Sequence, residues 1–151
     1  MPTSATGNDR GFTLIELVVV LAIIALGAAA VLFSVPGPER SLRDSSERLA
    51  AQAAALRDQA VLGARPMAIR IGPGGYRFEH YDGLAWVTER DKPFRAVKLP
   101  DGMSVTAVPS GEQRIRFDTT GLADPVVLSL GYAGLTRSIK VDAGGGVTLG
   151  E

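Results

Sequence analysis

The sequence predicts an α+β protein with a long N-terminal hydrophobic helix and a globular head, in which one helix packs on antiparallel β-sheets in a sandwich-like arrangement. Two changes of pattern along the chain predict this fold. The run from Phe12 to Phe33 is apolar, with Glu16 as its only charged residue. Beyond Pro36, apolar residues first recur at helical spacing, and after Pro66 they alternate with polar residues as in half-buried strands.

The first predicted helix covers residues 12–33. At about 1.5 Å per residue it would be about 33 Å long, close to the roughly 30 Å hydrocarbon thickness of a bilayer. A charge at mid-bilayer costs about 2.5–3.5 kcal/mol, so Glu16 indicates a functional residue with a partner. Two alternatives stay open. One is a removable secretory signal, since Arg10 precedes the run and residues 28–30 are alanines; the other is a plain membrane anchor.

Residues 34–38, SVPGP, predict a kink or linker, because Pro36 lacks the amide that a continuing helix would use. A second helix restarts after it, with Ser41 and Asp44 as a capping arrangement, and Gly63 and Pro66 bracket its end. One apolar stripe of this helix is expected to lie on the sheet: Leu42, Leu49, Ala53, Leu56 and Ala60. Charged residues take the other face, with Glu39–Arg43 and Asp44–Arg48 as pairs four residues apart.

Eight short strands are predicted after Pro66, separated by turns of glycine, proline and aspartate. Asp82-Gly83 is a strong hairpin signal between two of them. The strands are expected at Met67–Ile71, Tyr76–Tyr81, Leu84–Glu89, Met103–Val108, Arg114–Asp118, Val126–Leu130, Leu135–Val141 and Val147–Leu149.

Composition narrows the function of the head. The chain holds 16 basic and 16 acidic residues, so its net charge gives no overall attraction to nucleic acid or to an anionic membrane surface. It contains no cysteine, which excludes disulfides and thiolate metal sites. The residues beyond Phe33 are enough for one hydrophobic core.

Little in the sequence predicts catalysis. His80 is the only histidine and is expected to be a surface or packed residue. No serine lies in a nucleophile-elbow motif, and the glycine runs 72–75 and 144–146 lack the lysine and following helix of a phosphate-binding loop. Residues 89–98 carry four cations beside two acids and are expected to form a solvated loop rather than a nucleic-acid site. We therefore predict no enzyme activity, no cofactor and no metal.

The run Gly11-Phe12-Thr13-Leu14-Ile15-Glu16 closely resembles the class III signal of type IV pilins and type II secretion pseudopilins. The resemblance implies that a prepilin peptidase cuts between Gly11 and Phe12, that Phe12 becomes an N-methylated terminus, and that Glu16 helps the subunit to join a filament. Four residues of helix place Glu16 about 6 Å below the new terminus. There its carboxylate could meet the ammonium of a neighbouring subunit, and two charges buried together are tolerable where each alone is not.

The resemblance also implies an organisation of the chain. It is a pilin-like organisation, with the bacterial inner membrane crossed once and the head in the periplasm. The expected segments are a prepilin leader peptide at 1–11, a transmembrane and filament-core helix at 12–33, a kink or linker at 34–38, and a periplasmic head at 39–151.

Within this family, one helix, an all-β remainder and no cysteine look most like the minor pseudopilin H subgroup. The stretches 56–60, 63–66 and 75–78 are similar to that subgroup's helix end and first hairpin. The resemblance implies a structural subunit of the pseudopilus, at its tip, that supports export of folded proteins. Expected partners are the other minor pseudopilins, the major pseudopilin, the prepilin peptidase and the inner-membrane secretion platform. The alternative is a type IV pilus minor pilin of the FimT and FimU kind, in pilus assembly or DNA uptake.

Overall fold

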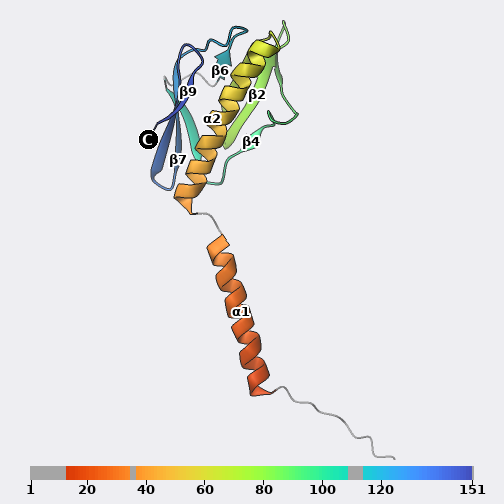
Figure 1. The fold of residues 1–151 in the computed structure, drawn as a ribbon, viewed down its shortest axis with the longest axis vertical. Helices are drawn as coiled ribbons and strands as arrows, with labels where there is room; N and C mark the ends of the chain where they lie inside the picture. The colour runs from red at the N-terminus through yellow and green to blue at the C-terminus, as the bar shows by residue number, and fades with distance from the viewer. Residues whose placement is uncertain (1–12, 35–36, 109–113, 151) are drawn as a thin grey trace, which may run out of the picture. The chain divides into compact units, whose positions relative to one another are not determined.

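The computed structural model describes residues 13–34, 37–108 and 114–150. The chain divides into two compact units, one up to Pro36 and one from Gly37 onward (Figure 1). The first unit contains helix α1 (Leu14–Ser34) and the second contains helix α2 (Pro38–Leu62) and all nine strands. The α+β fold class predicted from the sequence is therefore confirmed.

Helix α1 is apolar and its described side chains lie on the surface. Leu14 is 83% exposed and Leu26 is 72% exposed. At its start, the Thr13 hydroxyl oxygen accepts a hydrogen bond from the Glu16 amide at 3.3 Å, as an N-cap residue does. Among the residues that the structure describes, no helix combines the length and the apolar character needed to cross a membrane.

Helix α2 begins earlier than the sequence predicted. Gly37 is its N-cap and Pro38 its first residue, and no side chain caps the end, so the predicted Ser41–Asp44 capping arrangement was wrong. Proline at the first position removes one of the unpaired amides that a cap would satisfy. The amide of Ser41 instead donates to the Gly37 carbonyl at 3.0 Å, as a residue inside the helix.

The buried and exposed faces of α2 are those predicted from the sequence, but its ion pairs differ from the predicted ones. All five residues of the predicted stripe are buried, each at most 2% exposed. On the solvent face, Arg43 Nε lies 2.8 Å from Glu47 Oε1. Arg43 thus pairs toward the C-terminus of the helix and not with Glu39 in the first turn, and the predicted Asp44–Arg48 pair is also absent from the described residues. Glu47 raises the pKa of Arg43 by a hydrogen bond and by its charge.

The strands form two antiparallel sheets. The five-stranded sheet has the order β3-β2-β1-β6, with β4 paired to the other end of β2, and the four-stranded sheet has the order β5-β7-β8-β9. The bounds are β1 Met67–Gly72, β2 Gly75–Tyr81, β3 Trp86–Thr88, β4 Val97–Lys98, β5 Ser104–Val108, β6 Arg114–Phe117, β7 Val126–Tyr132, β8 Leu135–Val141 and β9 Val147–Gly150.

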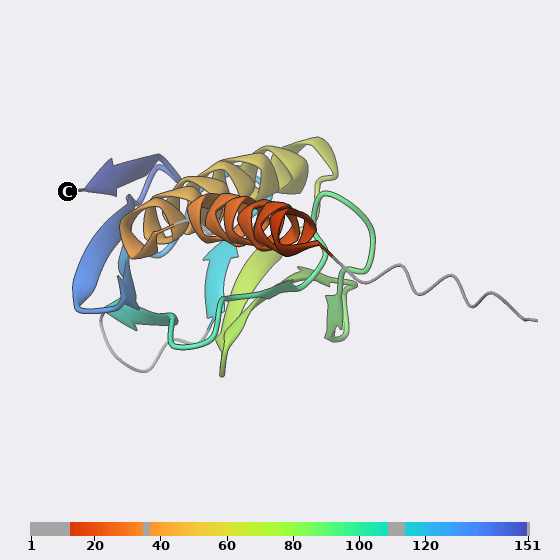
Figure 2. The same cartoon turned by 90° about the horizontal axis from the view of Figure 1, so that it is seen from below.

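Helix α2 covers the inner faces of both sheets. It contacts β1 and β6 of the first sheet and β7, β8 and β9 of the second. Figures 1 and 2 show the helix along the junction, with β7 and β9 to one side and β2 and β4 to the other. The core between them includes Phe78 and Phe117, both fully buried.

All eight predicted strands are present, and a ninth, β4, was missed. It lies at the end of the segment 89–98 that was predicted to be a solvated loop. The same segment buries Phe94, whose ring centroid is 5.4 Å from that of Phe78. Strand β4 can approach β2 because Gly75 lacks a side chain: a Cβ atom there would collide with the Val97 carbonyl oxygen.

Strand β3 is shorter than predicted because the hairpin turn before it is longer. Asp82 Oδ1 accepts hydrogen bonds from the Leu84 and Ala85 amides, both at 2.8 Å. Gly83 adopts φ +100°, which glycine tolerates without strain. These bonds lower the pKa of the Asp82 carboxyl.

Candidate functional site

The sequence placed one candidate site at the start of α1. Gly11 and Phe12, the expected cleavage and methylation residues, lie outside the described residues. Glu16 lies in the first turn of α1 and is exposed. A carboxylate at this end of a helix is favoured by the positive end of the helix dipole.

The head carries a second group of charged residues on the five-stranded sheet that the sequence did not predict. Glu79 of β2 has a side chain only 3% exposed. Its two carboxylate oxygens accept from Arg77 Nε at 3.0 Å and from Arg114 Nε at 2.9 Å. The Arg114 guanidinium also lies over the Trp86 ring, 4.9 Å from its centroid. A buried carboxylate thus holds two arginines in fixed positions, and the cation–π contact supports one of them.

His80 belongs to a separate hydrogen-bonded cluster around Glu89. Its Nδ1 lies 2.8 Å from Glu89 Oε1, which also accepts from Arg65 Nη2 at 3.1 Å. The His80 and Glu89 side chains are 19% and 17% exposed. The cluster ties β2 to the chain after β3 and to the turn that follows α2. Of the two positions expected for His80, surface or packed, the structure shows the packed one.

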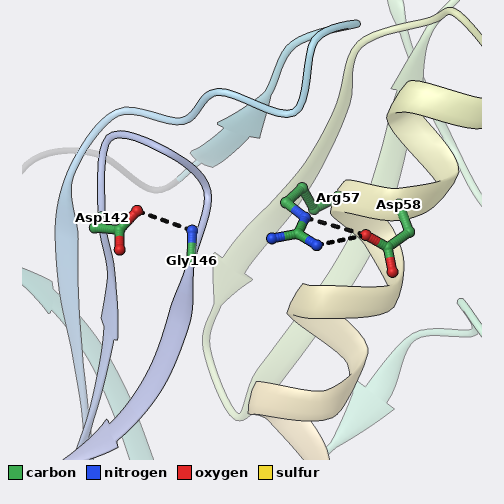
Figure 3. Close-up of polar contacts among 4 residues, drawn as sticks. All are labelled: Arg57, Asp58, Asp142 and Gly146. Atoms are coloured by element: carbon green, nitrogen blue, oxygen red, sulfur yellow. Dashed lines mark hydrogen bonds and ion pairs between the residues drawn. The ribbon is translucent and has the colours of Figure 1, made fainter.

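Where α2 nears its C-terminus, it meets two glycine turns of the head. A Cβ atom at Gly145 would lie 2.8 Å from Arg57 Cδ, and one at Gly121 would lie 3.5 Å from Arg57 Cγ. The arginine's aliphatic stem therefore packs against both turns, and its head group binds the neighbouring Asp58 through Nε and Nη2, at 3.1 and 2.7 Å (Figure 3).

The turn that contains Gly145 is held by its own carboxylate, Asp142. Asp142 Oδ1 accepts from the Gly146 amide at 2.9 Å, as Figure 3 shows. The glycine run 144–146 is therefore a turn between β8 and β9, as the sequence predicted. Groups of three or more His, Asp or Glu side chains arranged to hold a metal are absent from the part of the chain that the structure describes.

The fold of the head is that of pilin-like proteins. It is similar to the minor pseudopilin EpsH of the Vibrio cholerae type II secretion system, with a TM-score of 0.63, 16% identity, and coverage of 72% of this chain and 95% of that one. It is also similar to the type IV minor pilin FimU of Pseudomonas aeruginosa, with a TM-score of 0.60, 17% identity, and coverage of 77% and 93%.

Family matches narrow the class further. Residues 6–32 match the prokaryotic N-terminal methylation motif, and residues 45–145 match the type II transport protein GspH. The second match covers more than half of the chain, which therefore belongs to the GspH family. The type II secretion system protein H of Pseudomonas aeruginosa is 40% identical over 76 residues. This match spans 49% of this chain and 44% of the relative, less than half of its length. The resemblance to pseudopilin H inferred from the sequence is confirmed.

Proposed function

We propose that this chain is a minor pseudopilin of the type II secretion system, a structural subunit of the pseudopilus rather than an enzyme. The observation that carries the proposal is the family match over residues 45–145. In the bacterium, deletion of the gene should stop export of folded periplasmic proteins across the outer membrane, and the wild-type gene should restore it. Unchanged export with a loss of pilus assembly or DNA uptake would favour a minor pilin instead, an alternative that the likeness to FimU supports at the level of the fold.

In this proposal the N-terminal segment anchors the subunit and contains the site at which the peptidase cuts it. The methylation-motif match at residues 6–32 supports a cut between Gly11 and Phe12 by the prepilin peptidase. The exposed apolar side chains of α1 need a non-aqueous cover, either lipid or the same helix of neighbouring subunits. The resulting order is leader 1–11, inner-membrane and filament-core helix 12–33, linker 34–38 and periplasmic head 39–151.

Mass spectrometry of the mature protein tests this processing. The expected N-terminus is an N-methylated Phe12. A mature protein that begins near Val31 would establish the removable secretory signal instead, and an unprocessed chain with export intact would leave only a plain anchor.

Glu16 is proposed to assist assembly by neutralising the N-terminal ammonium of a neighbouring subunit. Both Glu16→Ala and Glu16→Gln should leave cleavage and head folding intact while impairing incorporation into the filament, since each removes the charge. Glu39→Gln is the matched control, because Glu39 is an exposed acid in the first turn of α2. Normal incorporation of both Glu16 variants would refute this role.

We further propose a place at the filament tip, with other minor pseudopilins as neighbours, the major pseudopilin below them, and the inner-membrane platform at the base. A tip subunit should be far less abundant than the major subunit in isolated filaments. It should also crosslink to another minor subunit in the membrane. An abundance equal to that of the major subunit would refute the tip position without touching the family assignment.

A further inference from the structure

Three arginines form one row across neighbouring strands of the five-stranded sheet. In the strand register, Arg77 of β2 lies opposite Arg70 of β1, and Arg70 lies opposite Arg114 of β6. Directly opposed residues of antiparallel strands project from the same face. The next residues along, Ile69, Phe78 and Ile115, are buried in the core, so the arginine row lies on the face that points away from α2.

Within the described part of the chain, the charges of this row are incompletely compensated. Like charges directly opposite one another on a sheet are destabilising. One carboxylate, Glu79, binds the two outer arginines. Arg70, in the middle, is partly buried and makes no ion pair with the residues that the structure describes. Among the residues that the structure describes, three positive charges therefore lie side by side against one negative charge.

A surface hollow of about 420 Å³ lies beside the row. Three cations line it, Arg70, Arg77 and Lys98, together with the glycine-rich β1–β2 turn and the chain around β4. None of its lining residues is acidic. Lys98 is held loosely by Asp101, at 3.7 Å between two exposed side chains. The hollow thus offers an anion several donors and glycine backbone that a ligand can approach closely.

We propose that this hollow and the arginine row bind the carboxylates of an acidic segment of a neighbouring protein, with Arg70 as the central contact. A guanidinium presents two parallel N–H donors that match a carboxylate. Such a ligand would supply the negative charge that the row lacks. The choice of a protein as the partner rests on the proposed role in a filament. The excess of positive charge in the row is independent of that role.

Two observations favour an acidic protein segment over nucleic acid. Nucleic acid is held by phosphate contacts summed along a basic surface, and here the chain has no net charge and Arg116, the next arginine of β6, is already paired with Asp124 at 2.9 Å. Stacking of bases needs free aromatic faces. The Trp86 ring beside the row already carries the Arg114 guanidinium over one face.

Fluorescence anisotropy on the full chain in uncharged detergent micelles tests the proposal. The probe is a short labelled peptide in which glutamate alternates with serine, and its partner peptide has glutamine in place of glutamate. The glutamate peptide should bind at low salt, and the glutamine peptide about tenfold more weakly or worse, because the bonds to charged groups are lost. Arg70→Gln should weaken binding about tenfold as well.

The matched control is Arg137→Gln on β8 of the other sheet. Arg137 is also a partly buried arginine without an ion pair among the described residues. The Arg137→Gln variant should bind the peptide as the wild type does. Arg70→Gln should also melt at a temperature no lower than that of the wild type, since it removes one of three adjacent like charges. Weaker binding without a lower melting temperature would show that Arg70 acts in binding rather than in stability.

Several results would overturn the proposal. The first is a glutamate peptide that does not bind. The second is a glutamine peptide that binds as tightly as the glutamate peptide. The third is an Arg70→Gln variant that binds the glutamate peptide as tightly as the wild type does. Tighter binding of a single-stranded oligonucleotide of equal charge would assign the site to nucleic acid. Self-association of the wild type that Arg70→Gln abolishes would assign it to a second copy of this chain. Each of these binding results can be obtained whether or not deletion of the gene stops export, so they test this proposal separately from the proposed function.

Discussion

Replacement of Glu79 by glutamine should destabilise the head strongly although it preserves the shape of the side chain. The wild-type carboxylate is 3% exposed and accepts one hydrogen bond from each of Arg77 and Arg114, at 3.0 and 2.9 Å. A hydrogen bond to a charged group contributes about 1.5–3 kcal/mol to the free energy of unfolding, and a neutral one about 0.5–1.5 kcal/mol. Weakening both bonds to Glu79 should therefore lower the free energy of unfolding by about 2 kcal/mol. The unbalanced arginine row adds about 0.5–1 kcal/mol, reduced by the solvent around the arginines.

The expected loss is therefore about 2–3 kcal/mol, or a Tm lower by about 10 °C for a head of this size. Thermal unfolding followed by circular dichroism of the full chain in uncharged detergent measures it. Glu47→Gln is the matched control: it breaks the exposed Arg43–Glu47 pair, whose side chains are 66% and 46% exposed, and should change stability by less than about 0.5 kcal/mol.

Two results would refute this reasoning. If Glu79→Gln melts at the same temperature as Glu47→Gln, the buried carboxylate does not organise the arginines. The double variant Glu79→Gln with Arg70→Gln should recover part of the loss, because it removes the central charge of the row. A double variant less stable than Glu79→Gln alone would contradict the repulsion that we infer.

Three further substitutions probe the packing of the head. Gly75→Ala should displace β4 and lower stability by about 1–3 kcal/mol, seen as faster proteolysis of residues 89–98, whereas Gly72→Ala, which meets nothing within 4 Å, should not. Leu56→Ala, at a fully buried position, should lose about 2–5 kcal/mol in urea denaturation, and a loss under about 1 kcal/mol would contradict the packing of the α2 stripe. Tyr76→Phe removes the hydroxyl that donates to Gln52 Oε1 at 2.8 Å and should lose about 1 kcal/mol at neutral pH. Burial raises the pKa of Tyr76 to about 12, from about 10 in the unfolded chain, so its neutral form stabilises the fold fully below pH 10 and less as the pH rises toward 12. Tyr76→Phe should therefore flatten the alkaline loss of stability, and an unchanged slope would refute this.

The parts of the fold that depend on local periodicity were predictable. The stripe from Leu42 to Ala60 repeats at helical spacing, and a helix can bury such a stripe in one way only. The eight strands were found because alternation and turn residues are both local signals. The Asp82-Gly83 hairpin was predicted for the same reason, since its hydrogen bonds join residues at most three apart.

The errors arose where a distant contact or a competing local signal decides the structure. Ser41 was predicted as a cap because its residue type suits one, but Pro38 begins the helix three residues earlier. Strand β4 was missed because its two residues have no alternating pattern, and its pairing depends on the absent side chain of Gly75. Neither feature of β4 is visible in a window of adjacent residues.

The arginine row could not be predicted at all, for a reason that applies to any sheet. Arg70, Arg77 and Arg114 each occupy the polar position of an alternating strand, and each by itself indicates an ordinary solvent-facing side chain. They become a row only through the register of β1 with β2, which the 72–75 turn sets, and of β1 with β6, which joins residues 44 positions apart. A slip of one residue in the β1–β6 pairing would bury Arg114 and expose Ile115. The apolar core therefore enforces the register, and the register brings the like charges together. Because the core leaves the sheet no alternative pairing, the repulsion within the row is relieved by solvent and by carboxylates rather than by a change of register. Of the described residues, Glu79 pairs with the two outer arginines of the row, and in our proposal Arg70 takes its carboxylate from a neighbouring protein.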